Sequence, residues 1–304
     1  WTNISSSSLG EGTGYCTETA SCNVMFKQRL VWKFIGLSTI ASLAGSDIQS
    51  ATFTVNGVHS YNCTAQTTYL WRTADISAAS NWSLQWLQSL STRTESQRPN
   101  CGTNGYRSFD AKAGFVWAAD ADSSTISLGL VTEELSMASW KRFANDATID
   151  IVYNRAPNVP TSQQLISPSL TTCTTGAGRP AIATTTPTLS AIVSDPDLSA
   201  VTAYFDVVTF VPDPNKAGGG RSVTVWSGNS GAAVTNGQRA SAAVAAGKLT
   251  NGTVYSWRVR GYDGARFGAL TGWCEFVVDT TAPSTPTVTP VTTGVAAVYF
   301  ESTE

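Results

Sequence analysis

Apolar and polar residues alternate through most of the first 155 positions. In the segment 24–35, one face carries the apolar side chains of Phe26, Leu30, Trp32 and Phe34. The opposite face carries Lys27, Arg29 and Lys33. A period of two residues is typical of a half-buried β-strand. The same period recurs in four later segments, at 51–55, 69–71, 126–130 and 149–153.

Two stretches depart from this period. Between 78 and 91 the large apolar residues are irregularly spaced, which predicts a short helical turn or an irregular loop. Residues 110–119 predict a second short helix. Trp32, Trp71 and Trp257 lie on alternating strand positions, so we expect them to be buried.

A proline-rich segment, Ala156-Pro157-Asn158-Val159-Pro160, marks a change in the chain. Proline fixes φ and favours extended backbone before it, so this segment predicts a stiff linker. Five further strands follow, at 188–193, 201–208, 221–226, 254–260 and 273–278. We expect an all-β chain of two tandem antiparallel β-sandwiches: domain 1–155, domain 156–282, and residues 283–304 as a linker with the start of a further domain.

The composition excludes several classes of function. Charged residues make up 13% of the chain and the net charge is -2, without a cluster of Lys and Arg. A surface that binds nucleic acid or anionic lipid needs such a cluster, so we expect neither partner. The apolar stretches are too short for a membrane-spanning helix, and we expect no membrane insertion. Because the chain opens on Trp1, we expect its natural start to lie upstream.

Six cysteines indicate an oxidising compartment. They are Cys16, Cys22, Cys63, Cys101, Cys173 and Cys274, and their spacing is not that of a zinc site. Six cysteines allow about 15 pairings. Sequence order favours Cys16–Cys22, Cys63–Cys101 and Cys173–Cys274, because each bridge then stays within one domain. Three disulfides predict a secreted or cell-surface protein.

Groups that could perform catalysis are sparse. His59 is the single histidine, and a serine hydrolase of the triad type needs a histidine base beside its nucleophile. The loop around Ser230 is similar to a serine-protease nucleophile loop, but it lies in the other domain. The pairs Glu133-Glu134 and Asp120 with Asp122 are placed near strand ends, where acidic residues usually face solvent. We therefore expect no enzyme and no cofactor. Calcium is the one possible ligand, because Asp195 and Asp197 could supply oxygen ligands, but turn chemistry favours a proline-anchored turn at these residues.

Three motifs carry a resemblance to a known family. They are Gly14-Tyr15-Cys16 with Cys22-Asn23, Trp140-Lys141-Arg142-Phe143, and the stretch 255–264 leading to Trp273-Cys274. Together they resemble the DNRLRE-type domains of actinobacterial secreted proteins, which are followed by a fibronectin type III-like domain. The resemblance implies a jelly-roll-like first domain, here N-terminally truncated, related to carbohydrate-binding modules, and a fibronectin- or immunoglobulin-like second domain.

Trp82 and Trp86 are the side chains that we expect to contact a glycan. They lie in a polar segment, and an exposed aromatic ring can stack on the apolar face of a sugar. Burial as a lid over the core is the alternative. The expected function is a non-catalytic extracellular display segment that could bind polysaccharide or cell-surface glycan. The alternatives are a carbohydrate-binding adhesion module proper, and part of the shell or stalk of a large YD-repeat-type toxin.

Overall fold

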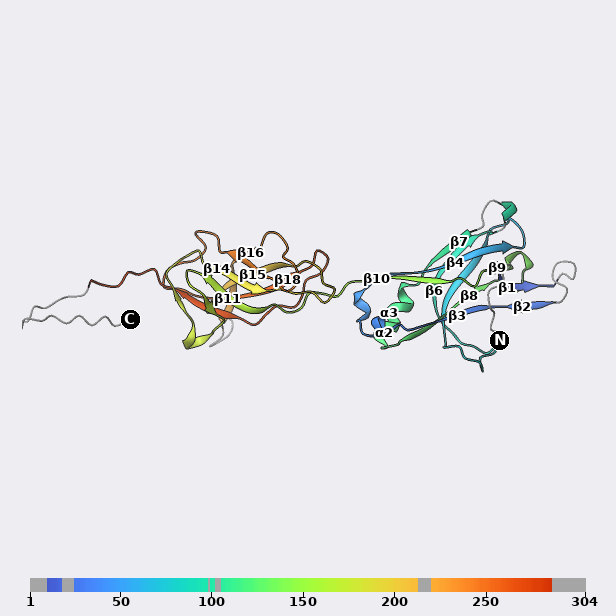
Figure 1. Ribbon diagram of the computed structural model, residues 1–304, viewed down its shortest axis with the longest axis horizontal. Helices are drawn as coiled ribbons and strands as arrows, with labels where there is room; N and C mark the ends of the chain where they lie inside the picture. Colours follow the sequence, from blue (N-terminus) through green and yellow to red (C-terminus); the bar gives the residue numbers. More distant parts are fainter. Residues whose placement is uncertain (1–9, 18–24, 98, 102–104, 213–219, 286–304) are drawn as a thin grey trace, which may run out of the picture. The chain divides into compact units, whose positions relative to one another are not determined.

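The chain folds as an all-β protein, as its alternating pattern predicts (Figure 1). The computed structural model describes residues 10–17, 25–97, 99–101, 105–212 and 220–285. Strands account for 49% of the structure and helices for 9%, so sheets carry the architecture. Two compact units divide the chain, the first ending at Ala156 and the second beginning at Pro157. The predicted start of a further domain, from residue 286 onward, lies outside the described residues.

The first unit is a sandwich of two antiparallel sheets. One sheet has the order β10-β4-β9-β1-β2, with β7 also paired to β4. Its strands are β1 (Glu11–Cys16), β2 (Phe26–Gln28), β4 (Ile48–Ser60), β7 (Gly105–Asp110), β9 (Lys141–Phe143) and β10 (Thr148–Tyr153). The other sheet has the order β3-β8-β5-β6. Its strands are β3 (Leu30–Ile35), β5 (Gln66–Thr73), β6 (Trp86–Glu95) and β8 (Thr125–Thr132).

Short helices complete the first unit. They are α2 (Ser38–Ala41), α3 (Lys112–Asp120), η1 (Gly45–Asp47), η2 (Pro99–Cys101) and η3 (Met137–Ser139). The helix predicted at 110–119 is confirmed as α3, which packs against β4, β6 and β8. Phe53, Leu70, Phe115 and Leu128 are fully buried between the sheets and the helix. Figure 1 shows α2 and α3 side by side at one end of this sandwich.

Three expectations for the first unit are wrong in detail. The predicted strand at 24–35 is interrupted at Arg29, so that β2 pairs with β1 while β3 pairs with β8 in the other sheet. The predicted turn at 78–91 becomes regular strand from Trp86 onward. Trp71 is only half-buried, because β5 directs Leu70 into the core instead. A period of two residues cannot say which of its two faces meets the core.

The second unit is also a sandwich. One sheet has the order β12-β11-β14-β17, and the other has the order β13-β19-β18-β15-β16. The first contains β11 (Thr161–Ser167), β12 (Thr171–Thr172), β14 (Thr188–Ile192) and β17 (Arg239–Ala243). The second contains β13 (Ala181–Ile182), β15 (Thr202–Pro212), β16 (Gly220–Asn229), β18 (Val254–Tyr262) and β19 (Cys274–Val278). Between β12 and β13 lies η4 (Gly176–Gly178).

The core of the second unit is apolar and continuous. Phe205, Trp257, Val259 and Phe276 are almost completely buried in it, which confirms the expectation for Trp257. The hydroxyl oxygen of Tyr255, near the start of β18, accepts a hydrogen bond of 2.9 Å from the backbone N–H of Thr250. This bond satisfies the hydroxyl of an otherwise buried tyrosine.

Two predicted disulfides are confirmed. Cys63 is bonded to Cys101, and Cys173 is bonded to Cys274, with Cα–Cα distances of 5.6 and 5.0 Å. Cys16 is also disulfide-bonded, whereas Cys22 lies outside the described residues. Disulfides of this kind are typical of extracellular proteins. Within the part of the chain that the structure covers, no helix is long and apolar enough to cross a membrane.

Candidate functional site

The outer face of the sheet β3-β8-β5-β6 carries a group of aromatic side chains. The rings of Trp71 and Trp86 meet edge to face, with centroids 6.5 Å apart. Trp71 lies opposite Gly129 of β8, and a Cβ atom at Gly129 would lie 2.7 Å from the Trp86 ring. The absence of a side chain at Gly129 therefore lets the Trp86 indole lie against the sheet.

Arg29 joins the two tryptophans that the sequence singles out. Its guanidinium carbon lies 4.2 Å from the ring centroid of Trp82 and 5.5 Å from that of Trp86. Glu134 holds the guanidinium from the other side, with Nε–Oε1 and Nη2–Oε2 distances of 2.5 and 2.9 Å. Such a two-pronged ion pair fixes the plane of the guanidinium. We call Arg29, Trp71, Trp82, Trp86 and Glu134 the Arg29 cluster.

A shallow hollow opens within the Arg29 cluster. It is lined by Arg29, Trp71, Trp86 and Val131 and has a volume of about 140 Å³. Trp82 is 52% exposed, while Trp86 is only partly exposed. The structure thus brings both predicted tryptophans to one site, but Trp82 is the one whose ring lies largely in solvent. An apolar hollow with flanking exposed indole suits a ligand that has both flat apolar faces and polar edges.

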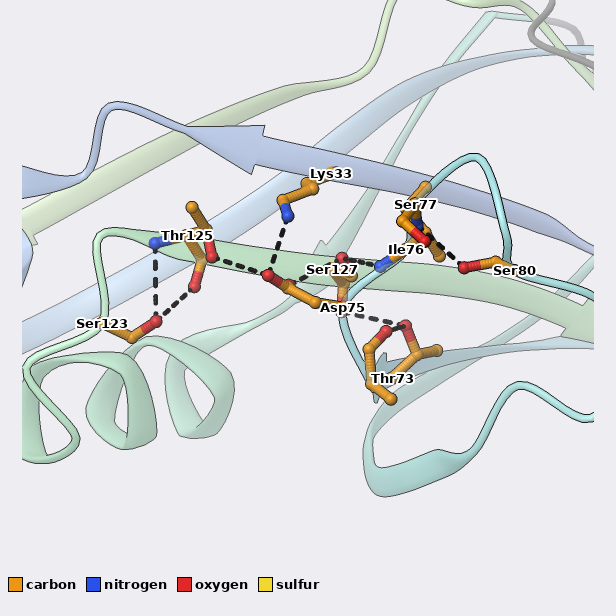
Figure 2. A network of polar contacts seen from close by, with 10 residues as sticks. Lys33, Thr73, Asp75, Ile76, Ser77, Ser80, Ser123, Thr125 and Ser127 are labelled. Carbon is orange, nitrogen blue, oxygen red and sulfur yellow. Dashed lines mark hydrogen bonds and ion pairs between the residues drawn. The ribbon is translucent and has the colours of Figure 1, made fainter.

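The loop that carries Trp82 is anchored to the sheet at its base. Asp75, two residues after the end of β5, accepts hydrogen bonds from Lys33 Nζ at 2.8 Å, Thr125 Oγ1 at 2.9 Å and Ser127 Oγ at 3.1 Å (Figure 2). Partial burial acts to raise the pKa of Asp75, but these hydrogen bonds outweigh it and lower the pKa below its usual value. Asp75 therefore stays ionised near neutral pH and ties the loop to β3 and β8.

The residues considered for catalysis have structural partners. Glu134 is engaged with Arg29, and Glu133 Oε1 accepts a hydrogen bond of 3.1 Å from the N–H of Leu135. The ring of His59 lies 5.5 Å from that of Trp140, centroid to centroid. The hydroxyl of Ser230, in the other unit, donates to the carbonyl oxygen of Ala232 at 3.3 Å.

The proposed calcium ligands form a turn. Asp195 is 2% exposed, and its Oδ1 accepts the N–H groups of Asp197 and Ser199 at 2.8 and 3.4 Å. This is the geometry of an aspartate that closes its own turn. In the described portion of the chain, no group of three or more His, Cys, Asp or Glu side chains is arranged to hold a metal ion. The contacts of Asp195 favour the turn interpretation.

Sequence reasoning missed three members of this site. Arg29 was assigned only to the polar face of a strand, Trp71 to the core, and Glu134 to solvent. The tertiary structure brings the Arg29 side chain beside Trp82, 53 positions later in the chain. The one signal available in the sequence was the group of aromatic residues between 71 and 86.

Comparisons with known proteins add little. No family model and no curated protein matches the chain. Three similar solved structures are a Bacteroides uniformis β-glucuronidase, a β-D-mannosidase from Dictyoglomus thermophilum, and the Endo-D glycoside hydrolase domain from Streptococcus pneumoniae R6. Their TM-scores are 0.23, 0.22 and 0.21, with 8%, 7% and 10% identity.

The matches cover 79%, 77% and 76% of this chain but only 25%, 27% and 30% of those structures. The chain therefore spans well under half of the proteins it matches. Structural similarity at such low TM-scores does not support any inference about the function of this protein.

Proposed function

We propose that this chain is a non-catalytic, extracellular display segment whose first unit binds a neutral polysaccharide at the Arg29 cluster. The observation that carries the proposal is that Trp82 and Trp86 lie on one surface, joined by a fixed guanidinium. The resemblance of the chain to secreted DNRLRE-type proteins, which are related to carbohydrate-binding modules, agrees with this role. The disulfides agree with an extracellular location.

The chemistry of the Arg29 cluster favours a sugar without charge. The positive charge of Arg29 is balanced by Glu134, so the site offers no net charge to a ligand. The ring of Trp82 offers an apolar surface on which the C–H face of a pyranose can stack. The guanidinium N–H groups near that ring can donate hydrogen bonds to the hydroxyls at the sugar edge.

Retention on an insoluble neutral polysaccharide tests this proposal. We expect Trp82→Ala to weaken retention on cellulose, chitin or xylan by about tenfold, the effect of losing a stacking contact of about 1.4 kcal/mol. Its melting temperature should stay unchanged, since the Trp82 side chain is mostly in solvent. Tyr106→Ala is the matched control, because Tyr106 is 66% exposed on β7, in the opposite sheet.

Two outcomes would contradict the proposal. One is equal retention of the wild-type protein, Trp82→Ala and Tyr106→Ala. The other is no retention of the wild-type protein on any neutral polysaccharide of a broad panel. A fall in melting temperature for Trp82→Ala with unchanged retention would show that this indole serves the fold instead.

A further inference from the structure

The second unit carries an exposed aromatic and charged face of its own. It lies on the outer surface of the sheet formed by β15 and β18, on the side away from the buried Phe205 and Val259. Cross-strand pairing places Tyr204 opposite Arg260, and Asp206 opposite Arg258. These two pairs are two residues apart along each strand, so they repeat at about 7 Å.

The first pair belongs to an aromatic group. The guanidinium carbon of Arg260 lies 4.0 Å from the ring centroid of Phe267. Tyr204 and Tyr262 pack around that ring, with centroid distances of 5.1 and 4.5 Å. Phe267 remains 43% exposed. Arg260 has no carboxylate within ion-pair distance among the described residues, so its charge is uncompensated.

The second pair has a similar construction. The guanidinium carbon of Arg258 lies 4.5 Å from the ring centroid of Trp273, and Phe210 lies beyond that ring at 6.4 Å. Arg258 Nε is 3.6 Å from Asp206 Oδ2, which is longer than a hydrogen bond, and Nε has no other partner. The two pairs therefore contain two arginines and one carboxylate, Asp206, which lies near Arg258 alone, and together they carry an excess of positive charge.

We propose that this face binds a polysaccharide that carries carboxylate groups, such as a polyuronate. A guanidinium stacked on a ring is held in one plane, and its fork of donors matches a carboxylate. The aromatic rings beside each arginine suit the flat apolar side of a sugar ring. A polymer fits because the same pairing of ring and arginine occurs twice along one strand.

An acidic polypeptide is the rival ligand, because it also offers carboxylates. Its carboxylates sit on flexible side chains and bring no flat apolar ring beside each charge. The exposed rings of Phe267 and Phe210 would then be left without a partner. This difference is why we favour the polysaccharide, and it can be measured.

The test is affinity electrophoresis of the whole chain in gels that contain polygalacturonate, pullulan or poly-L-glutamate. We expect polygalacturonate to retard both the wild-type protein and Trp82→Ala, pullulan not to retard Trp82→Ala, and poly-L-glutamate to retard both proteins clearly less than polygalacturonate does. Arg260→Gln should weaken binding of polygalacturonate about tenfold, the effect of losing one charge-assisted hydrogen-bonded pair. Phe267→Ala should weaken it as well, and its melting temperature checks that losing the ring contacts with Tyr204 and Tyr262 leaves the fold intact.

Lys248→Gln is the matched control, since it removes one exposed positive charge from the same unit outside this face. The proposal is overturned if Lys248→Gln weakens binding as much as Arg260→Gln, or if polygalacturonate does not retard the wild-type protein. Equal retardation by poly-L-glutamate would overturn the choice of ligand. Trp82→Ala should bind polygalacturonate normally, so failure of this inference and failure of the Arg29 cluster are distinguishable.

Discussion

Lys141 is a buried residue whose charged form is destabilised in the folded protein. Its side chain is completely buried on β9, where Nζ donates to the carbonyl oxygen of Gln66 and to Thr68 Oγ1. Burial lowers the pKa of Lys141, Glu95 opposes this shift and Arg107 adds to it, and the pKa falls to about 8. In the unfolded chain the pKa of a lysine is about 10.4.

The first prediction is that raising the pH stabilises the first unit. Between pH of about 8 and 10.4 the unfolded chain keeps a proton that the folded chain has lost, so the free energy of unfolding rises with pH, by up to about 3 kcal/mol. Below about pH 8 both states are protonated and the effect is constant. Urea unfolding followed by tryptophan fluorescence at several pH values should show this rise in the wild-type protein.

Lys141→Met should abolish the rise in that window, while Lys248→Met, at an exposed lysine, should retain it. If Lys141→Met shows the same dependence on pH as the wild-type protein, the pKa of Lys141 is not the cause.

Gly129 is the second residue on which the site depends. Alanine there would place Cβ 2.7 Å from two atoms of the Trp86 ring, and the ring would have to move. We expect Gly129→Ala to lower the free energy of unfolding by about 1–3 kcal/mol, the usual cost of overpacking. Retention on neutral polysaccharide should fall as well. Gly178→Ala is the control, because no atom lies within 4 Å of its added Cβ.

At the scale of elements, the disulfides differ in the loops that they close. Cys173–Cys274 connects the end of β12 to the start of β19 across 101 positions, and Cys63–Cys101 spans 38. On the chain-entropy model the longer loop contributes about 4.7 kcal/mol and the shorter about 3.9. We therefore predict that replacing both cysteines of the longer bridge by serine lowers the free energy of unfolding more, by about 0.8 kcal/mol.

Guanidinium unfolding of the two double variants, each compared with the wild-type protein, measures this difference. A larger loss from the Cys63–Cys101 pair would show that the local structure around each bridge, and not the length of its loop, sets its contribution.

Elements were predicted well where alternation was regular and poorly where strands changed sheets. Periods at 51–55, 126–130 and 149–153 correspond to β4, β8 and β10. The regular alternation of 24–35 concealed the transfer of the chain from one sheet to the other at Arg29, because both strands keep the same pattern of faces. β6 was missed at its start, where the apolar pattern is irregular.

At the scale of the whole molecule, each unit has an apolar core of its own, and Cys63–Cys101 lies within the first unit and Cys173–Cys274 within the second. The two faces that we propose as binding sites lie one on each unit. The face on the second unit was not predicted at all, because Tyr204, Phe267 and Arg260 come from separate segments that only strand pairing joins.

The sequence by itself determined the β-rich class of the fold, the α3 helix and two disulfide pairs, since these depend on local periodicity and on the order of cysteines. It also singled out Trp82 and Trp86, whose contact with a glycan stays a prediction. Tertiary structure alone decided which face of β5 is buried and brought Arg29 to Glu134, 105 positions away. The physical reason is that alternation is symmetric between two faces, whereas burial and ion pairing depend on what another sheet or loop places opposite them.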